Sequence, residues 1–107
     1  MIKIIDGKRY NTETAKRVYE WCNSYLPGDF KHRSKDLYRT QKGAWFLLHY
    51  GGALTDMAIS VQGGTGGSSS IEPISDDDAF GFLQAHSDDS DAAKALETYF
   101  GDRIEDA

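Results

Sequence analysis

The chain opens with a short apolar segment followed directly by a turn-forming pair. Ile2–Ile5 contains three isoleucines, Asp6-Gly7 follows, and Lys8–Tyr10 resumes an extended pattern. Glycine adopts positive φ without steric cost, which suits the two-residue turn of a β-hairpin. The first ten residues are therefore predicted to form two short antiparallel strands.

The next apolar positions follow the spacing of an amphipathic helix. Four of them fall at i, i+3, i+4 and i+7: Ala15, Val18, Tyr19 and Cys22. Such positions share one helical face. Asn11 or Thr12 supplies a side-chain oxygen of the kind that caps a helix N-terminus, and Pro27-Gly28 stops any continuation. A helix is predicted over residues 12–23, with the thiol of Cys22 buried on its apolar face.

Two strand-like segments flank a glycine-containing turn in the middle of the chain. Residues 36–40 alternate between polar and apolar, residues 41–43 read Gln-Lys-Gly, and residues 44–50 are rich in aromatic and aliphatic side chains. This arrangement is a strong hairpin signal. The second segment is apolar at successive positions, so it is predicted to be a central strand covered on both faces.

Small and polar residues dominate the segment that follows. Gly51-Gly52 ends the central strand, and Ile59–Val61 is expected to be a further short strand. Residues 63–70 read GGTGGSSS, a composition typical of flexible linkers. We expect this glycine-rich segment to be a mobile loop.

Two helices are predicted near the C-terminus. Ser75 is a good N-cap, and Asp76, Asp77 and Asp78 fill a first turn, where the helix dipole favours negative charge. Asp88–Asp91 supplies a loop and a second cap. The last helix has a regular apolar stripe, and its members are Ala92, Ala95, Leu96, Tyr99 and Phe100. Such a stripe is typical of a helix packed on a core.

These elements predict a single α+β domain over residues 1–107. The expected architecture is an antiparallel sheet of three to four strands with three helices packed on it. With 107 residues, 39% of them apolar and 27% charged, the chain suits one globular core.

Charge is distributed unevenly along the chain. Residues 1–70 carry ten Lys/Arg against six Asp/Glu, a net charge of +4, whereas residues 71–107 carry two against eleven, a net charge of −9. Such a split can mark a surface for a charged partner. The ordinary alternative is a solvated acidic face balanced by a basic one.

Cysteine content and the lack of long apolar runs favour the cytoplasm. Cys22 is the one cysteine, so no internal disulfide can form, and a reducing compartment is favoured. The N-terminus lacks the apolar run of a signal peptide, and no stretch approaches the roughly 20 residues of a membrane span. We expect a cytoplasmic protein.

The sequence contains no recognisable catalytic or metal-binding pattern. His32, His49 and His86 have no second His or Cys at zinc-ligand spacing. The glycine-rich segment lacks the lysine of a phosphate-binding loop, and Asp88–Asp91 lacks the glycine and late glutamate of a calcium loop. We therefore expect no enzyme activity, no metal and no cofactor; an enzyme would need a polar pocket that this pattern does not reveal.

Two charged segments are candidate binding surfaces. The acidic candidates for a partner-protein contact lie on the two C-terminal helices: Asp76, Asp77, Asp78, Asp88, Asp89, Asp91 and Glu97. Their dense charge resembles that of nucleic-acid phosphates and would attract a protein that normally grips nucleic acid. The basic candidates for nucleic-acid contact are Lys31, Arg33, Lys35 and Arg39, near aromatic side chains that could stack on bases.

Three segments also resemble small uncharacterised accessory proteins of prophages and mobile elements: IDGKRYNTETA, DLYRTQKGAWFLLHYGGALTDMA and EPISDDDAFGFL. The resemblance covers most of the chain, and its motifs are turn, cap and core residues. It implies a non-enzymatic protein that binds a host protein, such as an anti-CRISPR-like inhibitor of a nucleic-acid-handling complex. The alternative is a small nucleic-acid-associated or regulatory protein that uses the basic segment over residues 31–42.

Overall fold

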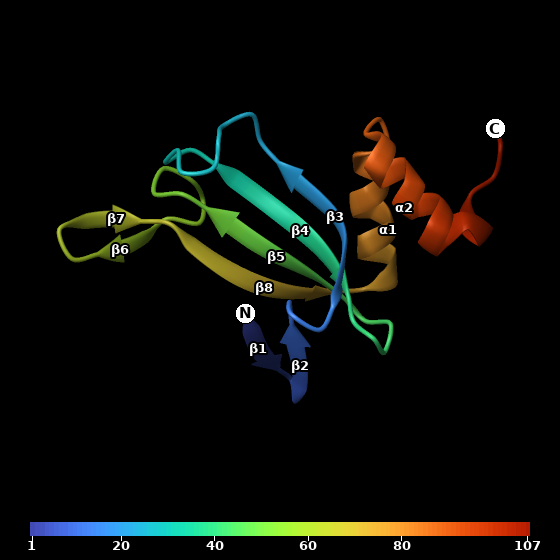
Figure 1. Cartoon of the computed structure of the whole chain (residues 1–107), viewed down its shortest axis with the longest axis horizontal. Coiled ribbons are helices and arrows are strands. Elements are labelled where there is room, and N and C mark those ends of the chain that lie inside the picture. The colour runs from blue at the N-terminus through green and yellow to red at the C-terminus, as the bar shows by residue number, and fades with distance from the viewer.

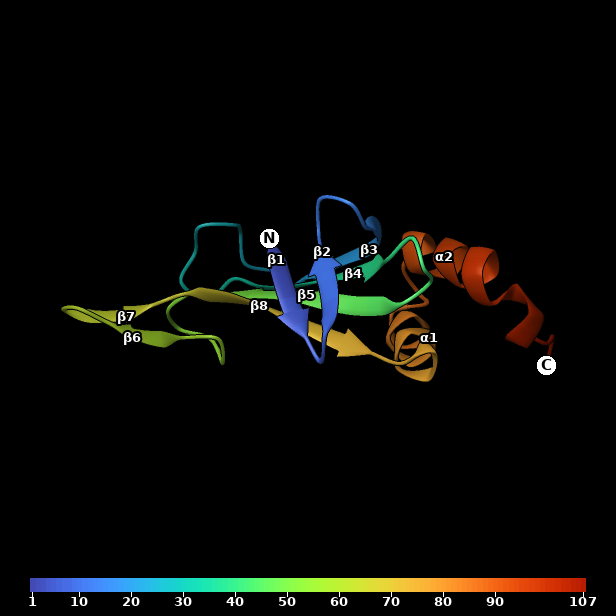
Figure 2. The same ribbon diagram turned by 90° about the horizontal axis from the view of Figure 1, so that it is seen from below.

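The computed structural model describes residues 1–107 as an elongated molecule built on one central sheet. Its principal extents are 53, 35 and 19 Å. Figures 1 and 2 show a long, flat sheet with two helices at one end and a small hairpin projecting from the other. The strands are β1 (Ile2–Ile5), β2 (Lys8–Asn11), β3 (Lys16–Cys22), β4 (Arg33–Arg39), β5 (Trp45–Gly51), β6 (Ile59–Val61), β7 (Gly64–Gly66) and β8 (Ser68–Ile74). The helices are α1 (Asp76–Ala85) and α2 (Ser90–Phe100), followed by the 3₁₀ turn Gly101–Arg103.

The central sheet has four antiparallel strands in the order β3-β4-β5-β8. The hairpin predicted over residues 36–50 is present as β4 and β5, which pair from Arg33 opposite Gly51 to Arg39 opposite Trp45. As predicted, β5 lies inside the sheet and carries buried side chains on both faces: Leu47 faces the helices, and Phe46 faces the opposite side.

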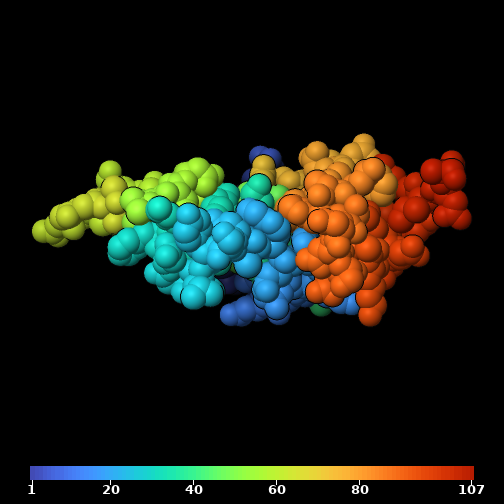
Figure 3. Space-filling model, turned by 90° about the horizontal axis from the view of Figure 1, so that it is seen from above, coloured from blue at the N-terminus to red at the C-terminus, as the bar shows by residue number.

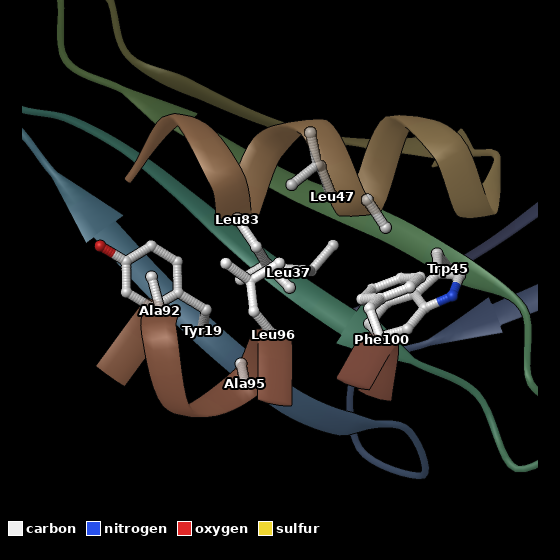
Figure 4. Packing of buried hydrophobic residues seen from close by; sticks show 10 residues of the cluster. Tyr19, Leu37, Trp45, Leu47, Leu83, Ala92, Ala95, Leu96 and Phe100 are labelled. Carbon is white, nitrogen blue, oxygen red and sulfur yellow. The ribbon is translucent and has the colours of Figure 1, made fainter. Parts of the chain in front are cut away.

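The larger core lies between the sheet and the two helices (Figure 4). Tyr19, Leu37, Trp45 and Leu47 project from three neighbouring strands toward the helices. The helices contribute Ala79 and Leu83 from α1 and Ala92, Ala95, Leu96 and Phe100 from α2. The apolar stripe read from the sequence of the last helix is therefore its packed face. This core fixes the position of the acidic helices on the sheet.

A smaller core lies on the opposite face, under the β1–β2 hairpin. Tyr10 of β2 packs on Tyr38, Phe46 and Ile71 of the sheet. The Tyr38 and Phe46 rings are stacked, with centroids 5.1 Å apart and planes 4° from parallel, and Tyr10 meets Phe46 edge-on at 5.6 Å. The predicted N-terminal hairpin thus closes the second face of the sheet.

The helix predicted over residues 12–23 is wrong: this segment contains β3. Strand β3 pairs with β4 from Lys16 opposite Arg39 to Cys22 opposite Ser34, with a register shift between Arg17 and Tyr19. Val18, Tyr19 and Trp21 are β-branched or aromatic and favour strands. A register shift, of the kind that a β-bulge produces, interrupts the alternation of side chains along a strand. Here it disturbs the period-2 pattern enough to resemble helical spacing. Cys22 is exposed rather than buried.

The mobile loop predicted over residues 63–70 is also wrong. Gly64–Gly66 pairs with Ile59–Val61 as β7, and Ser68–Ser70 forms the first part of β8 beside β5. Ladder hydrogen bonds need only backbone groups, so small residues can join a sheet when neighbours provide the pairing. Gly67 permits a close approach, because a Cβ there would lie 2.5 Å from the Gly51 carbonyl oxygen.

The predicted numbers of helices and strands therefore need correction. The chain is α+β with antiparallel sheets, but it has two α-helices rather than three, and eight strands in three sheets. Both helices contribute to the core on one face of the central sheet. Neither α1 nor α2 has the length and apolar character that a membrane span requires.

Candidate binding surface

The first acidic group, Asp76, Asp77 and Asp78, lies at the start of α1. Two of its three carboxylates form local hydrogen bonds or ion pairs. The Asp78 N–H donates to the Ser75 hydroxyl (3.0 Å), and the Ser75 N–H donates to the Asp78 carboxylate (3.5 Å), which completes a capping box. Asp77 accepts a hydrogen bond from the Arg103 guanidinium at 3.0 Å. Asp76 makes no such bond, so its carboxylate is available to a partner.

The second acidic group surrounds the start of α2. Asp89 is the N-cap, and its carboxylate accepts the Asp91 N–H (2.9 Å) and the Tyr19 hydroxyl (3.0 Å). Burial of the Tyr19 ring and the hydrogen bond to Asp89 raise the pKa of the tyrosine hydroxyl to about 12. Asp88 and Asp91 make no side-chain hydrogen bond, so this group also combines structural and free carboxylates.

All seven predicted contact carboxylates are exposed, and six of them form two groups, at the starts of α1 and α2, rather than one. The Arg103–Asp77 ion pair sets the end of α2 beside the start of α1, so the two helices run in opposite directions. The groups therefore lie at opposite ends of α1, about 15 Å apart for ten helical residues. Glu97 lies further along α2. Figure 3 shows the two helices as a continuous mass at one end of the molecule, so both groups belong to one acidic end.

Removing the Tyr19 hydroxyl should weaken the junction between β3 and α2. Tyr19→Phe is expected to lower the free energy of unfolding by about 1–2 kcal/mol at pH 7, because a partly buried hydrogen bond to a carboxylate is lost. The folded-state pKa is about 12, against an ordinary value of 10.0. This contribution is therefore present below pH 10 and disappears as the pH rises toward 12.

Urea unfolding at a series of pH values checks this expectation. The wild-type chain should lose stability between pH 10 and 12 more steeply than Tyr19→Phe. Tyr50→Phe is the control, because the Tyr50 side chain is 38% exposed and its hydroxyl makes no hydrogen bond. Equal alkaline slopes for wild type and Tyr19→Phe would contradict the assignment.

The four predicted basic residues do not form one patch. Arg33 and Arg39 stand at opposite ends of β4, six residues apart, or about 20 Å along a strand. The Arg39 guanidinium lies over the rings of Trp45 (4.9 Å) and Tyr99 (5.3 Å), in a shallow pocket that Asp76 and Asp102 also line. Arg39 therefore belongs to the acidic end and is separated from the other three basic residues.

Arg33 is held in a network that the sequence did not suggest. Its guanidinium donates to Asp56 (2.8 Å) and to Nδ1 of His49 (2.9 Å), and Nε2 of His49 lies 2.8 Å from Glu72. An arginine only donates, so Nδ1 must accept and Nε2 must carry the proton toward Glu72. The network ties the loop after β5 to the sheet. Lys31 and Lys35 have no carboxylate partner, and their ammonium groups lie over the rings of Tyr25 (5.6 Å) and Trp21 (6.0 Å).

The other residues with possible chemistry are placed apart. His32 is buried, with Nδ1 2.8 Å from the Tyr25 carbonyl oxygen, and His86 is the C-cap of α1. No group of three or more His, Cys, Asp or Glu side chains is arranged to hold a metal ion. Asp36 lies opposite Glu20 in the β3–β4 ladder, and burial together with the Glu20 charge raises the pKa of the Asp36 carboxyl.

A groove between β3 and α2 was also not predicted, because it requires β3 to be a strand. It has a volume of about 400 Å³. From β3 it is lined by Lys16, Arg17, Val18, Tyr19 and Glu20, and from α2 by Asp91, Lys94, Ala95, Thr98 and Tyr99. Arg17 and Glu20 pair with each other at 2.9 Å, whereas Lys16 and Lys94 have no carboxylate partner.

Comparison with protein-family models, with curated proteins and with solved structures gave no match to this chain.

Proposed function

We propose that this chain is a non-enzymatic accessory protein of a phage or mobile element that binds a host protein through its acidic end. The partner would present a basic surface of the kind that holds nucleic acid, as in a CRISPR effector complex. An inhibitor of this type would occupy the nucleic-acid-binding channel of its partner, in place of the phosphate backbone of the nucleic acid.

One observation carries the proposal: the helical layer concentrates negative charge at one end of an elongated molecule. Residues 75–107 carry ten Asp/Glu and two Lys/Arg, and α1 and α2 pack on one face of the central sheet. Fixed carboxylates on packed helices keep their spacing, so a partner binds them without first ordering a flexible segment. Exposed charges of one sign also speed association with an oppositely charged surface.

The structure allows a sharper test than simple reversal of Asp76, Asp77 and Asp78. Asp77 and Asp78 hold the start of α1 in place, so lysine at these positions would weaken the helix as well as the charge. The side chains of Asp76, Asp88 and Glu97 make no hydrogen bond or ion pair, and they represent the first acidic group, the second acidic group and the later part of α2, respectively. The informative variant is therefore Asp76→Lys/Asp88→Lys/Glu97→Lys.

Capture from bacterial lysate by the immobilised chain, followed by mass spectrometry, identifies the bound proteins. Each captured nucleic-acid-handling protein is then purified, and its affinity is measured at low and high salt. The triple variant should lose affinity by about tenfold or more, and salt should weaken wild-type binding, because exposed charge pairs are screened. Guide-loaded CRISPR nucleases provide a direct assay, in which the wild-type chain should block DNA cleavage and the variant should not.

Glu13→Lys is the control for a single charge reversal, because it reverses an exposed, unpaired carboxylate outside the acidic end. It should leave affinity close to wild type. Binding that neither salt nor the triple variant changes would overturn the proposal, as would failure to capture any nucleic-acid-handling protein.

The nucleic-acid alternative is weaker, because Arg39 stands apart from the other basic residues and Arg33 is paired with Asp56. A gel-shift assay with random duplex and single-stranded DNA distinguishes the two proposals. The acidic-end proposal predicts no shift, whereas direct nucleic-acid binding predicts a shift that salt abolishes.

A further inference from the structure

The outer edge of β3 has backbone groups without a strand partner. β3 is the terminal strand of the central sheet and pairs only with β4. The Asn23 N–H donates to the Arg33 carbonyl, and hydrogen-bonded pairs alternate along an antiparallel ladder. Tyr19 and Trp21 therefore bond inward to β4, while Glu20 and Cys22 direct their N–H and C=O groups away from the sheet.

The opposite edge of the sheet is protected from such pairing. β8 forms that edge and contains Pro73, which has no N–H, and proline is found on edge strands where it prevents further strand addition. No proline occurs in β3. The regular part of its open edge, Tyr19–Cys22, follows the register shift near Val18 and is long enough for a short strand only.

Helix α2 forms a wall beside the first part of β3, and the groove between them reaches the open edge at Tyr19 and Glu20. This groove combines apolar and basic surface. Val18, Ala95 and Tyr99 provide the apolar part. Lys16 and Lys94 provide two ammonium groups without carboxylate partners, against one unpaired carboxylate, Asp91. A strand edge supplies main-chain hydrogen bonds, and the adjoining wall selects side chains.

We propose that the groove between β3 and α2 binds an extended peptide segment of a partner protein by strand addition. The preferred segment has an apolar and an acidic side chain two residues apart, since alternate residues of a strand face the same side. A second copy of this chain is a poorer occupant, because joining two such grooves would place Lys16 and Lys94 of one copy beside the same two lysines of the other copy. The inference is independent of the acidic end, and the Asp76→Lys/Asp88→Lys/Glu97→Lys variant should keep peptide binding.

Selection of a random heptapeptide phage library on the full chain provides the probe. The enriched peptides are synthesised with a fluorescent label, and their affinity is measured by fluorescence polarisation. They should contain the apolar–acidic spacing. Hydrogen exchange of the Glu20 and Cys22 amides should slow when peptide is added, because their N–H groups become bonded.

Two variants at one position separate backbone pairing from side-chain effects. Glu20→Pro removes an outward N–H that serves no bond within the sheet, and Glu20→Ala removes the same side chain but keeps that N–H. Glu20→Pro should weaken peptide binding by roughly tenfold or more, and Glu20→Ala should leave it within roughly threefold. If the proline variant does not fold, Lys16→Glu/Lys94→Glu serves instead and should abolish the preference for acidic peptides.

The proposal is overturned if no peptide is enriched, or if the Glu20 and Cys22 amides exchange at the same rate with and without peptide. Equal binding by the two Glu20 variants would also exclude strand addition. Protection of these amides in a concentration-dependent dimer without peptide would identify a second copy as the occupant and contradict the assignment.

Discussion

Phe46→Ala should lower the free energy of unfolding by about 3–5 kcal/mol, the range measured when a buried aromatic ring is truncated. Phe46 is 0% exposed, and its ring contacts both Tyr38 and Tyr10. The core under the β1–β2 hairpin has only four buried residues, so little surrounding structure can move in to fill the space. Urea unfolding followed by circular dichroism measures the loss.

The same variant should loosen the N-terminal hairpin before the rest of the molecule. Tyr10 would lose its edge-on ring contact with the sheet, so the amides of β2 should exchange faster than those of β4. Tyr50→Ala is the control, since Tyr50 lies on the same strand but is 38% exposed. A loss for Phe46→Ala no larger than for Tyr50→Ala would contradict the packing described for this face.

Gly52→Ala should lower the free energy of unfolding by roughly 2–3 kcal/mol, as expected when an added methyl group meets structure that cannot move aside. A Cβ at Gly52 would lie 2.5 Å from the Phe30 carbonyl oxygen and 2.9 Å from that of Asp29. This backbone is held by hydrogen bonds from the Gly52 N–H to His32 (2.9 Å) and from the Leu54 N–H to Phe30 (2.8 Å). The loops after β3 and β5 should therefore separate.

Gly81→Ala is the control, and its expected effect on stability has the opposite sign. Gly81 lies within α1, and nothing lies within 4 Å of a Cβ built there. Alanine should raise stability by about 0.5–1 kcal/mol, because glycine inside a helix is entropically unfavourable. Thermal unfolding of both variants measures the difference, and a Gly52→Ala chain as stable as wild type would show that the two loops are not in close contact.

The two proposed binding surfaces lie close together but differ in chemistry. The acidic end would bind by long-range charge attraction, so its affinity depends on salt. The groove would bind through backbone hydrogen bonds along β3, so its affinity depends on the N–H of Glu20. Asp91 belongs to both surfaces. For this reason, neither the Asp76→Lys/Asp88→Lys/Glu97→Lys variant nor the Lys16→Glu/Lys94→Glu variant changes it.

Several features follow from local chemistry and were predicted from the sequence. The first hairpin, the β4–β5 hairpin and the Ser75 cap depend on residues next to each other in the chain. The turn at Asp6-Gly7 shows this directly, since both residues have positive φ, 52° and 75°. The acidic character of the C-terminal region is likewise a property of composition, and it holds however the helices pack.

Other features depended on which segments became neighbours in space. Residues 16–22 have a spacing that suits a helix, but pairing with β4 and burial of Tyr19 under α2 favour the strand. Ser68–Ser70 has weak strand propensity, and pairing with β5 decides its structure. The Arg33–His49–Glu72 network joins three different strands, so no local pattern could reveal it.

The sequence by itself thus determined the turns, the helix caps and the excess of carboxylates near the C-terminus, because these rest on a few adjacent side chains. Only the tertiary structure decided that β3 is an edge strand, that α2 lies beside it, and that the carboxylates form two groups at the ends of α1. The physical reason is that pairing and burial depend on distant residues, and their free energies exceed the small local preferences of a seven-residue segment.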